Sequence, residues 1–261
     1  MKFNLGNLYL LILLTATVIN TSAQKLPSEQ KEGFYVPAGL KIDGKTTEWD
    51  NKFQAHNTAT MLYYTVANDK DNLYLVMQTD QQAATDKIFH GGITLEIRCR
   101  DKSKKLNAAK ITFPQVSLTQ RSEIVLPLRD KKNNADSAAV IVNARLQSYS
   151  KQIAIEGLNG LTEPDVSVYN DLDLKAAVRA DATRAVSFEL QVPLKYIRQL
   201  IGADSTFDYS IIVNGAKLEP GMRVVNGSSL SGGISISASP ESNPIFSPTY
   251  LKASYALVKK P

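Results

Sequence analysis

Residue types that often carry protein chemistry are scarce in this chain of 261 residues. It contains one cysteine, one tryptophan and two histidines. With Cys99 alone, no disulfide within the chain can form, so a protein of this size must rely on its hydrophobic core for stability. We therefore expect Cys99 to be a small buried apolar residue rather than a nucleophile.

The scarcity of histidine limits the catalytic and metal-binding arrangements that the chain can build. His56 and His90 are far apart, no Gly-x-Ser-x-Gly elbow occurs, and a zinc site needs about three His or Cys ligands at local spacing. Carboxylates such as Glu96 and Glu189 are available, but nothing in the pattern marks a glycosidase pair. We expect a protein that is not an enzyme and that binds no metal and no cofactor.

Basic charge is not concentrated in any one segment, although the formal net charge is +5. The densest basic run, Arg98 to Lys105, is interrupted by Asp101 and lacks interleaved aromatic residues. Nucleic-acid binding normally requires a larger basic face, so we do not expect it here.

Long apolar runs are absent after the first residues of the chain. Lys2, an apolar run from Leu8 to Val18, and small residues at Thr21 and Ala23 have the layout of a secretory signal peptide cleaved before Gln24. The run is shorter than the roughly 20 residues of a membrane span. We expect residues 1–23 to be removed and the mature protein to be exported, to the periplasm or the cell surface, without a membrane span.

Downstream of a polar segment at 24–33, interpreted as a flexible leader, apolar residues alternate with a period of two. Turn-forming residues separate the apolar stretches, which favours strands joined as hairpins. The predicted strands are 61–67, 73–79, 92–99, 109–113, 138–147, 151–158, 174–181, 185–192, 207–215 and 250–258.

Helical signals are few. Pro193 and Gly202 bracket a segment with apolar residues at helical spacing, which predicts a helix, and 81–89 is a candidate for a second. Residues 114–137 give no firm period, and 215–248 read mostly as loop. The pattern predicts an all-β fold, a two-sheet antiparallel β-sandwich of jelly-roll type with one or two short helices.

Several motifs, in this order and spacing, resemble family 9 carbohydrate-binding modules and the wider group of DOMON-like sandwich domains. They are LKIDGKTTEWD (40–50), NDKDNLYLVMQTD (68–80), AKITFP (109–114) and SFELQVPLKYI (187–197). The resemblance implies a single sandwich domain over residues 34–258. It also implies that the early tryptophan is a structural plug, so Asp43, Gly44 and Trp49 are expected to be structural.

The same resemblance implies that sugars stack on other aromatic residues, at a loop end or on a sheet face. A clamp of two tryptophans is impossible in this chain, which leaves tyrosines and phenylalanines. The candidates are Tyr63, Tyr64, Phe89, Tyr149 and Tyr169.

Two loops, 81–91 and 159–173, are the expected ligand site. Phe89 or Tyr169 would supply a flat face, and fixed polar groups would bind hydroxyls. The predicted ligand-binding residues are Phe89, His90, Asp165, Tyr169, Asn170 and Asp171.

Two other readings of these residues remain open. Oxygen donors between Glu163 and Asp173 are dense enough for Ca²⁺, but a solvated loop with capped turns is the favoured reading, because the spacing is not that of an EF-hand. DOMON-like relatives include haem-binding domains with Met and His ligands, for which Met61, Met77, His56 and His90 are formally available.

The prediction for function is an exported, non-catalytic binding protein whose ligand is a glycan. The alternative is a structural or protein-interaction sandwich, with a protein partner in the cell envelope, that has lost the sugar site. A haem-binding domain is the third and weakest reading.

Overall fold

The computed structural model describes residues 25–100, 108–130, 132, 134–217 and 243–260. The predicted signal peptide lies outside these residues, as do most of the basic run and most of 215–248. Within the described residues, no helix combines the length and apolar character that a membrane crossing requires.

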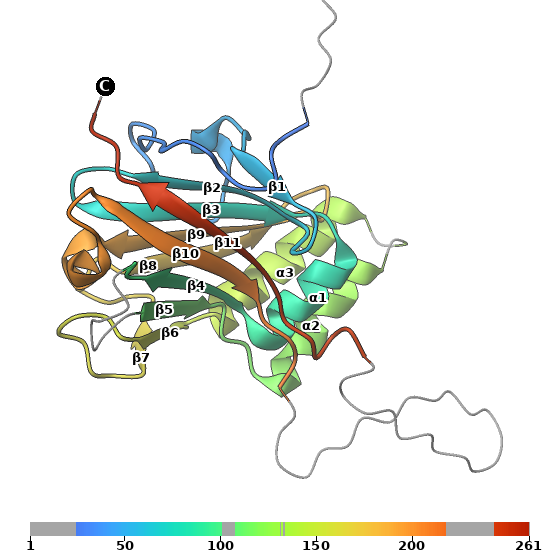
Figure 1. Cartoon of the computed structure of the whole chain (residues 1–261). Coiled ribbons are helices and arrows are strands. Elements are labelled where there is room, and N and C mark those ends of the chain that lie inside the picture. The colour runs from blue at the N-terminus through green and yellow to red at the C-terminus, as the bar shows by residue number, and fades with distance from the viewer. Residues whose placement is uncertain (1–24, 101–107, 131, 133, 218–242, 261) are drawn as a thin grey trace, which may run out of the picture.

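Two antiparallel sheets form the body of the protein (Figure 1). The first, sheet A, contains in spatial order β1 (Ala55–Asn57), β2 (Leu62–Asn68), β3 (Asn72–Thr79), β9 (Val186–Pro193) and β8 (Lys175–Ala180). The second, sheet B, contains β11 (Thr249–Ala256), β10 (Thr206–Val213), β4 (Ile93–Arg98), β5 (Ala108–Phe113), β6 (Gln152–Glu156) and β7 (Asp165–Ser167).

The predicted two-sheet architecture is confirmed, and so are most of the hairpins. β2 pairs with β3, β4 with β5, and β8 with β9, each as an antiparallel neighbour. The main core lies between the sheets and includes Leu75, Ile97, Phe188 and Tyr209. Cys99 is buried in this core, as expected.

The prediction of an all-β fold is wrong, because 23% of the chain is helical against 34% in strands. The described residues contain three α-helices, and α2 contacts both of the others at one side of the sandwich (Figure 1). They are α1 (Gln82–Gly91), α2 (Leu118–Arg129) and α3 (Ala135–Tyr149). Helix α1 was anticipated at 81–89, and α2 lies in the segment without a firm period.

Helix α3 replaces the strand predicted at 138–147. Its buried residues Ala138, Val142 and Leu146 recur every fourth position, while Val140 is 70% exposed. Asn134 caps the helix by accepting hydrogen bonds from the second and third helical N–H groups. This spacing places one face of a helix on the sheets, whereas a strand would have buried Val140 together with Val142.

The helix predicted at 193–202 is instead two 3₁₀ turns, Leu194–Tyr196 and Arg198–Leu200. Ile197 lies between them with a φ of −121° and a ψ of 4°, outside α-helical geometry. Its side chain is fully buried in the core. The helix is therefore interrupted at Ile197, where the backbone conformation allows the side chain to pack in the core.

Side-chain amides attach both ends of the described chain to β2. The Gln30 amide donates to the Val66 carbonyl at 2.8 Å and accepts from the Val66 N–H at 2.7 Å. The Asn68 amide does the same with Val258, at 2.9 and 3.0 Å. The segment interpreted as a flexible leader is thus bound to the sheet at Gln30 rather than free along its length.

Candidate functional site

The segment LKIDGKTTEWD (40–50) folds onto the outer face of sheet A, around one buried carboxylate. The neighbours of Glu189 on β9, Phe188 and Leu190, face the main core, so the Glu189 side chain lies on the opposite, outer face of the sheet. It is nevertheless only 1% exposed, because the 43–49 turn covers it. Its Oε2 accepts from the Asp43 and Gly44 N–H groups, at 2.9 and 2.8 Å. Its Oε1 accepts from Trp49 Nε1 at 2.8 Å.

Burial raises the pKa of Glu189 to about 7, because removal from water disfavours the charged carboxylate. The three N–H donors partly oppose this rise, and the nearby Asp43 carboxylate adds to it. The carboxylate has no free face for a ligand or a substrate, so its role is to fix the turn.

Trp49 is 5% exposed and packs on Ala67, Tyr74 and Val76 in a small core of its own. Gly44 has a φ of +82°, and a Cβ there would lie 2.8 Å from the Arg179 Cβ, so only glycine fits the turn. The buried Trp49 ring therefore has no face open to a sugar, and the turn at Gly44 requires a glycine.

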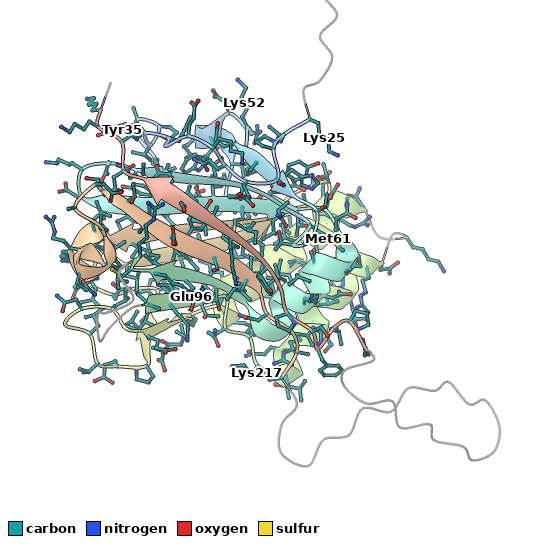
Figure 2. The ribbon with its side chains drawn as sticks, viewed as in Figure 1. Lys25, Tyr35, Lys52, Met61, Glu96 and Lys217 are labelled. Carbon is teal, nitrogen blue, oxygen red and sulfur yellow. The ribbon has the colours of Figure 1, made fainter. Side chains whose placement is uncertain are left out.

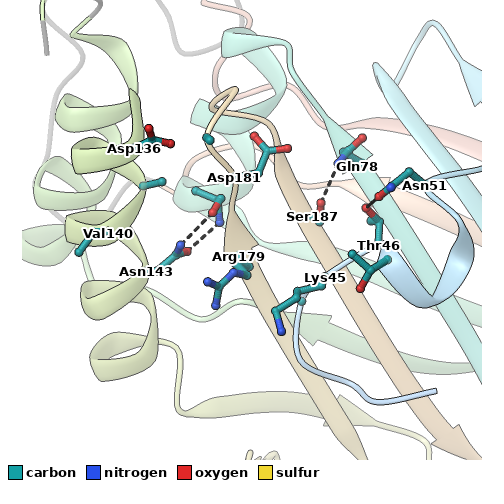
Figure 3. Close-up of a pocket in the computed structure, with 15 residues that line it drawn as sticks. Lys45, Thr46, Asn51, Gln78, Asp136, Val140, Asn143, Arg179, Asp181 and Ser187 are labelled. Carbon is teal, nitrogen blue, oxygen red and sulfur yellow. Dashed lines mark hydrogen bonds between the residues drawn. The ribbon is translucent and has the colours of Figure 1, made fainter. Parts of the chain in front are cut away.

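A groove of about 590 Å³ lies between this turn and helix α3 (Figure 3). Ser187 on β9, bonded to the Gln78 amide at 2.9 Å, lines it together with Thr46 and Lys45. Arg179 on β8 and Asn143 on α3 complete its central part. Most of the residues that line it have polar side chains, but the surface that they expose in the groove is largely apolar, so the groove offers a few hydrogen-bonding groups on an apolar lining.

A second hollow of about 640 Å³ continues along β8 and shares Asn143 and Arg179 with the first. It extends to Tyr169, which is 72% exposed, and to Asn170. We call the two hollows together the β8 groove. The volume of each hollow lies within the range of small-molecule sites.

Two asparagines in the β8 groove bond to the backbone at the two ends of the edge strand β8. The Asn143 amide donates to the Ala180 carbonyl and accepts from the Ala180 N–H, both at 2.8 Å (Figure 3). At the other end, the Asn170 amide donates to the Leu174 carbonyl at 2.8 Å. No sequence pattern indicates either contact, because the partners are backbone groups that only the fold brings near these side chains.

The structure separates the predicted site residues into two groups. Phe89 is 1% exposed and stacks toward Phe188 in the core, so it offers no face to a sugar. His90 lies beside it on α1, and its Nδ1 donates to the Asp86 carbonyl at 2.6 Å. Helix α1 and strand β7 lie at opposite sides of the sandwich, so the two predicted loops do not form one site (Figure 1).

The second group lies in the loop around β7. Tyr169 and Asn170 line the β8 groove, whereas Asp165 and Asp171 are exposed and do not line it. The Asn170 side chain is committed to the loop itself, because its oxygen also accepts from the Leu172 N–H at 2.9 Å. Of the predicted residues, Tyr169 is therefore the one whose side chain is available to a ligand in this groove.

The other aromatic candidates are less accessible than Tyr169. Tyr64 is fully buried, and Tyr63 is half-buried and stacked on His56 with 4.1 Å between ring centroids. Tyr149 is half-buried, and its hydroxyl donates to Glu123 at 2.8 Å.

No group of three or more His, Cys, Asp or Glu side chains gathers in a metal-binding arrangement within the described residues. The carboxylates between Glu163 and Asp173 are thus not brought together. Of the formal haem ligands, Met77 is buried in the main core, while Met61 is partly exposed.

Glu96 and Glu189 lie on opposite outer faces of the sandwich and cannot flank one glycosidic bond. Glu96 is on β4 of sheet B (Figure 2), and Arg98 donates to its carboxylate. Glu189 is on sheet A and covered by the turn that holds Trp49. The two carboxylates named from the sequence therefore do not constitute a glycosidase pair.

Comparison with models of protein families, with curated proteins and with solved structures found no match for this chain.

Proposed function

We propose that the protein is an exported, non-catalytic binding protein whose ligand lies in the β8 groove. The observation that carries this proposal is the continuity of two hollows of about 590 and 640 Å³ along one edge strand. Arg179, Lys45 and Gln147 offer polar groups in it, and the exposed ring of Tyr169 stands at one end.

A glycan is the ligand class that the exposed aromatic ring favours. Sugar recognition uses a flat aromatic face against C–H groups, together with a few fixed hydrogen-bonding groups for hydroxyls. Tyr169 supplies the former and the polar groups of the β8 groove supply the latter. With a single ring available, binding would be weak, around the millimolar level that corresponds to about 4 kcal/mol.

Tyr169→Ala is expected to abolish oligosaccharide binding and to leave the melting temperature unchanged, because the side chain is exposed. Isothermal calorimetry with a panel of oligosaccharides measures the first effect, and circular dichroism the second. Tyr250→Ala is the matched control, since Tyr250 is also exposed, at 55%, but lies on β11 outside the groove. Equal binding by wild type and Tyr169→Ala would place the sugar site elsewhere.

Export is tested separately. Protein recovered from outside the cytoplasm is expected to begin at Gln24 or within a residue or two of it, because Thr21 and Ala23 form the small-residue cleavage pattern. N-terminal sequencing checks this. A mature protein that retains Met1 would contradict cleavage.

The second candidate is a protein-interaction domain, which the free backbone edge of β8 favours.

A further inference from the structure

The edge of β8 is open over one short interval. In an antiparallel pair, alternate residues direct both backbone groups away from the partner strand. Ala180 is such a residue, because its N–H and carbonyl bond to Asn143 rather than to β9. The unbroken register with β9 gives Ala176 and Val178 the same orientation. Their outward N–H and carbonyl groups have no partner among the described residues.

This opening is enclosed by the groove rather than exposed on a flat edge. Asn170 and Asn143 occupy the outward backbone groups on either side, at Leu174 and Ala180. Both asparagines, together with Ala176 and Val178, line the 640 Å³ hollow. The space beside β8 thus has room for a neighbouring backbone. The Asn170 and Asn143 side chains, which we call the two caps, limit the length of this space.

An unpartnered buried hydroxyl lines the same hollow. Ser150 is 6% exposed, and its Oγ has no hydrogen-bond partner. A buried hydroxyl without a partner is costly, so native proteins usually satisfy such groups. A ligand in the hollow would supply the missing partner.

Charge identifies the kind of segment that fits. Lys175 and Arg179 are exposed and lie on the same face of β8, four residues apart. Neither forms a salt bridge among the described residues, although Arg179 lies near enough to Asp43 for its charge to lower the pKa of that carboxyl. The acidic residue in this hollow, Asp43, is already paired with Lys45 at 2.9 Å. A second copy of the same edge would place like charges together, whereas an acidic strand would neutralise them.

We propose that β8 binds an extended acidic peptide segment by strand addition, between the Asn170 and Asn143 caps. This inference rests on the binding function proposed for the β8 groove, and it adds a peptide to the glycan proposed there. The segment pairs its backbone with Ala176 and Val178. Its alternate side chains are acidic and lie beside Lys175 and Arg179, while the intervening ones are small or apolar and face Phe113 and Val168.

The test uses the purified protein and a capped hexapeptide of alternating valine and glutamate. Calorimetry is expected to show binding that weakens at least tenfold when the peptide's backbone amides are N-methylated, because strand pairing requires those N–H groups. A peptide with lysine in place of glutamate is expected not to bind. Equal affinity for the N-methylated or the lysine peptide would overturn the proposal.

Two protein variants locate the contact. Ala176→Pro removes an outward N–H without removing a bond to β9, and is expected to weaken peptide binding at least tenfold. Ala176→Gly also changes the side chain but retains the N–H, so it is expected to bind the peptide as the wild type does and serves as the control. Ser150→Ala is expected to weaken binding severalfold while keeping or raising the melting temperature, because it deletes an unsatisfied hydroxyl. If Ala176→Pro does not fold, the N-methylated peptide still decides the question on the wild type.

The remaining outcomes distinguish this inference from the proposed function. An oligosaccharide that binds in the β8 groove while no peptide binds would overturn the inference and leave the binding function intact. A dimer that is lost in Ala176→Pro would assign the edge to a second copy and overturn the peptide. Absence of binding by both peptides and oligosaccharides would overturn the inference and the proposed function together.

Discussion

Trp49→Ala is expected to lower the free energy of unfolding by about 3–5 kcal/mol, as large-to-small changes in protein cores do. The indole packs on Val76 and Tyr74, and the substitution also removes the N–H donor to Glu189. The loss should be the same with or without any glycan. Urea denaturation followed by far-ultraviolet circular dichroism measures it, since the only tryptophan is absent from the variant.

Trp49→Phe provides the matched comparison. It keeps an aromatic ring in the outer cluster but cannot donate to Glu189 Oε1, so its loss of stability should be smaller than that of Trp49→Ala. A Trp49→Ala protein that keeps its denaturation midpoint and loses only affinity for a ligand would show that the indole is a binding platform rather than a plug.

Glu189 should contribute to the free energy of unfolding of the wild type, and this contribution should decrease as the pH rises from about 4.5 to 7. The pKa of this carboxyl is raised from its usual 4.5 to about 7 by burial. In this window the folded state binds more protons than the unfolded state, so stability decreases as pH rises and levels off above pH 7. The full change corresponds to about 3 kcal/mol.

Glu189→Gln isolates this contribution, because the amide is neutral at every pH and similar in shape. Denaturation of both proteins from pH 4 to 9 gives a stability difference from which the other titrating groups cancel. We expect the difference to change through the window from 4.5 to 7 in the direction that disfavours the wild type at higher pH. A difference that is constant with pH would refute the raised pKa.

Sequence patterns were sufficient for the strands whose alternation is bounded by turns. Leu73, Leu75 and Met77 face the main core, as their period of two requires. A strand was predicted at 138–147, where the structure has α3, because the run from Ala138 to Val142 is continuously apolar. Such a run fits a buried strand or a helix equally well. The asparagine cap at Asn134 was the available signal for the helix.

The candidate site was predicted less completely than the fold. The burial of Trp49 follows from the frequency with which a single large aromatic residue is core. Its hydrogen-bond partner Glu189 lies 140 residues away in the sequence, and no local sequence pattern predicts a hydrogen bond between two such distant residues. Phe89 and Tyr169 were equivalent as aromatic residues in loops, and only the packing of α1 against the sheets separates the buried ring from the exposed one.

The attachment of both chain ends to β2 has a mechanical consequence. The Gln30 side chain bonds to the backbone of Val66, and the Asn68 side chain bonds to the backbone of Val258. Val66 and Asn68 lie two residues apart on β2. Tension applied between residues 30 and 258 would therefore act first on bonds to two nearby residues of the same strand. The β8 groove lies on the far edge of sheet A, outside this line of force. A protein held in this way is expected to keep the shape of the β8 groove when it is pulled at these two positions.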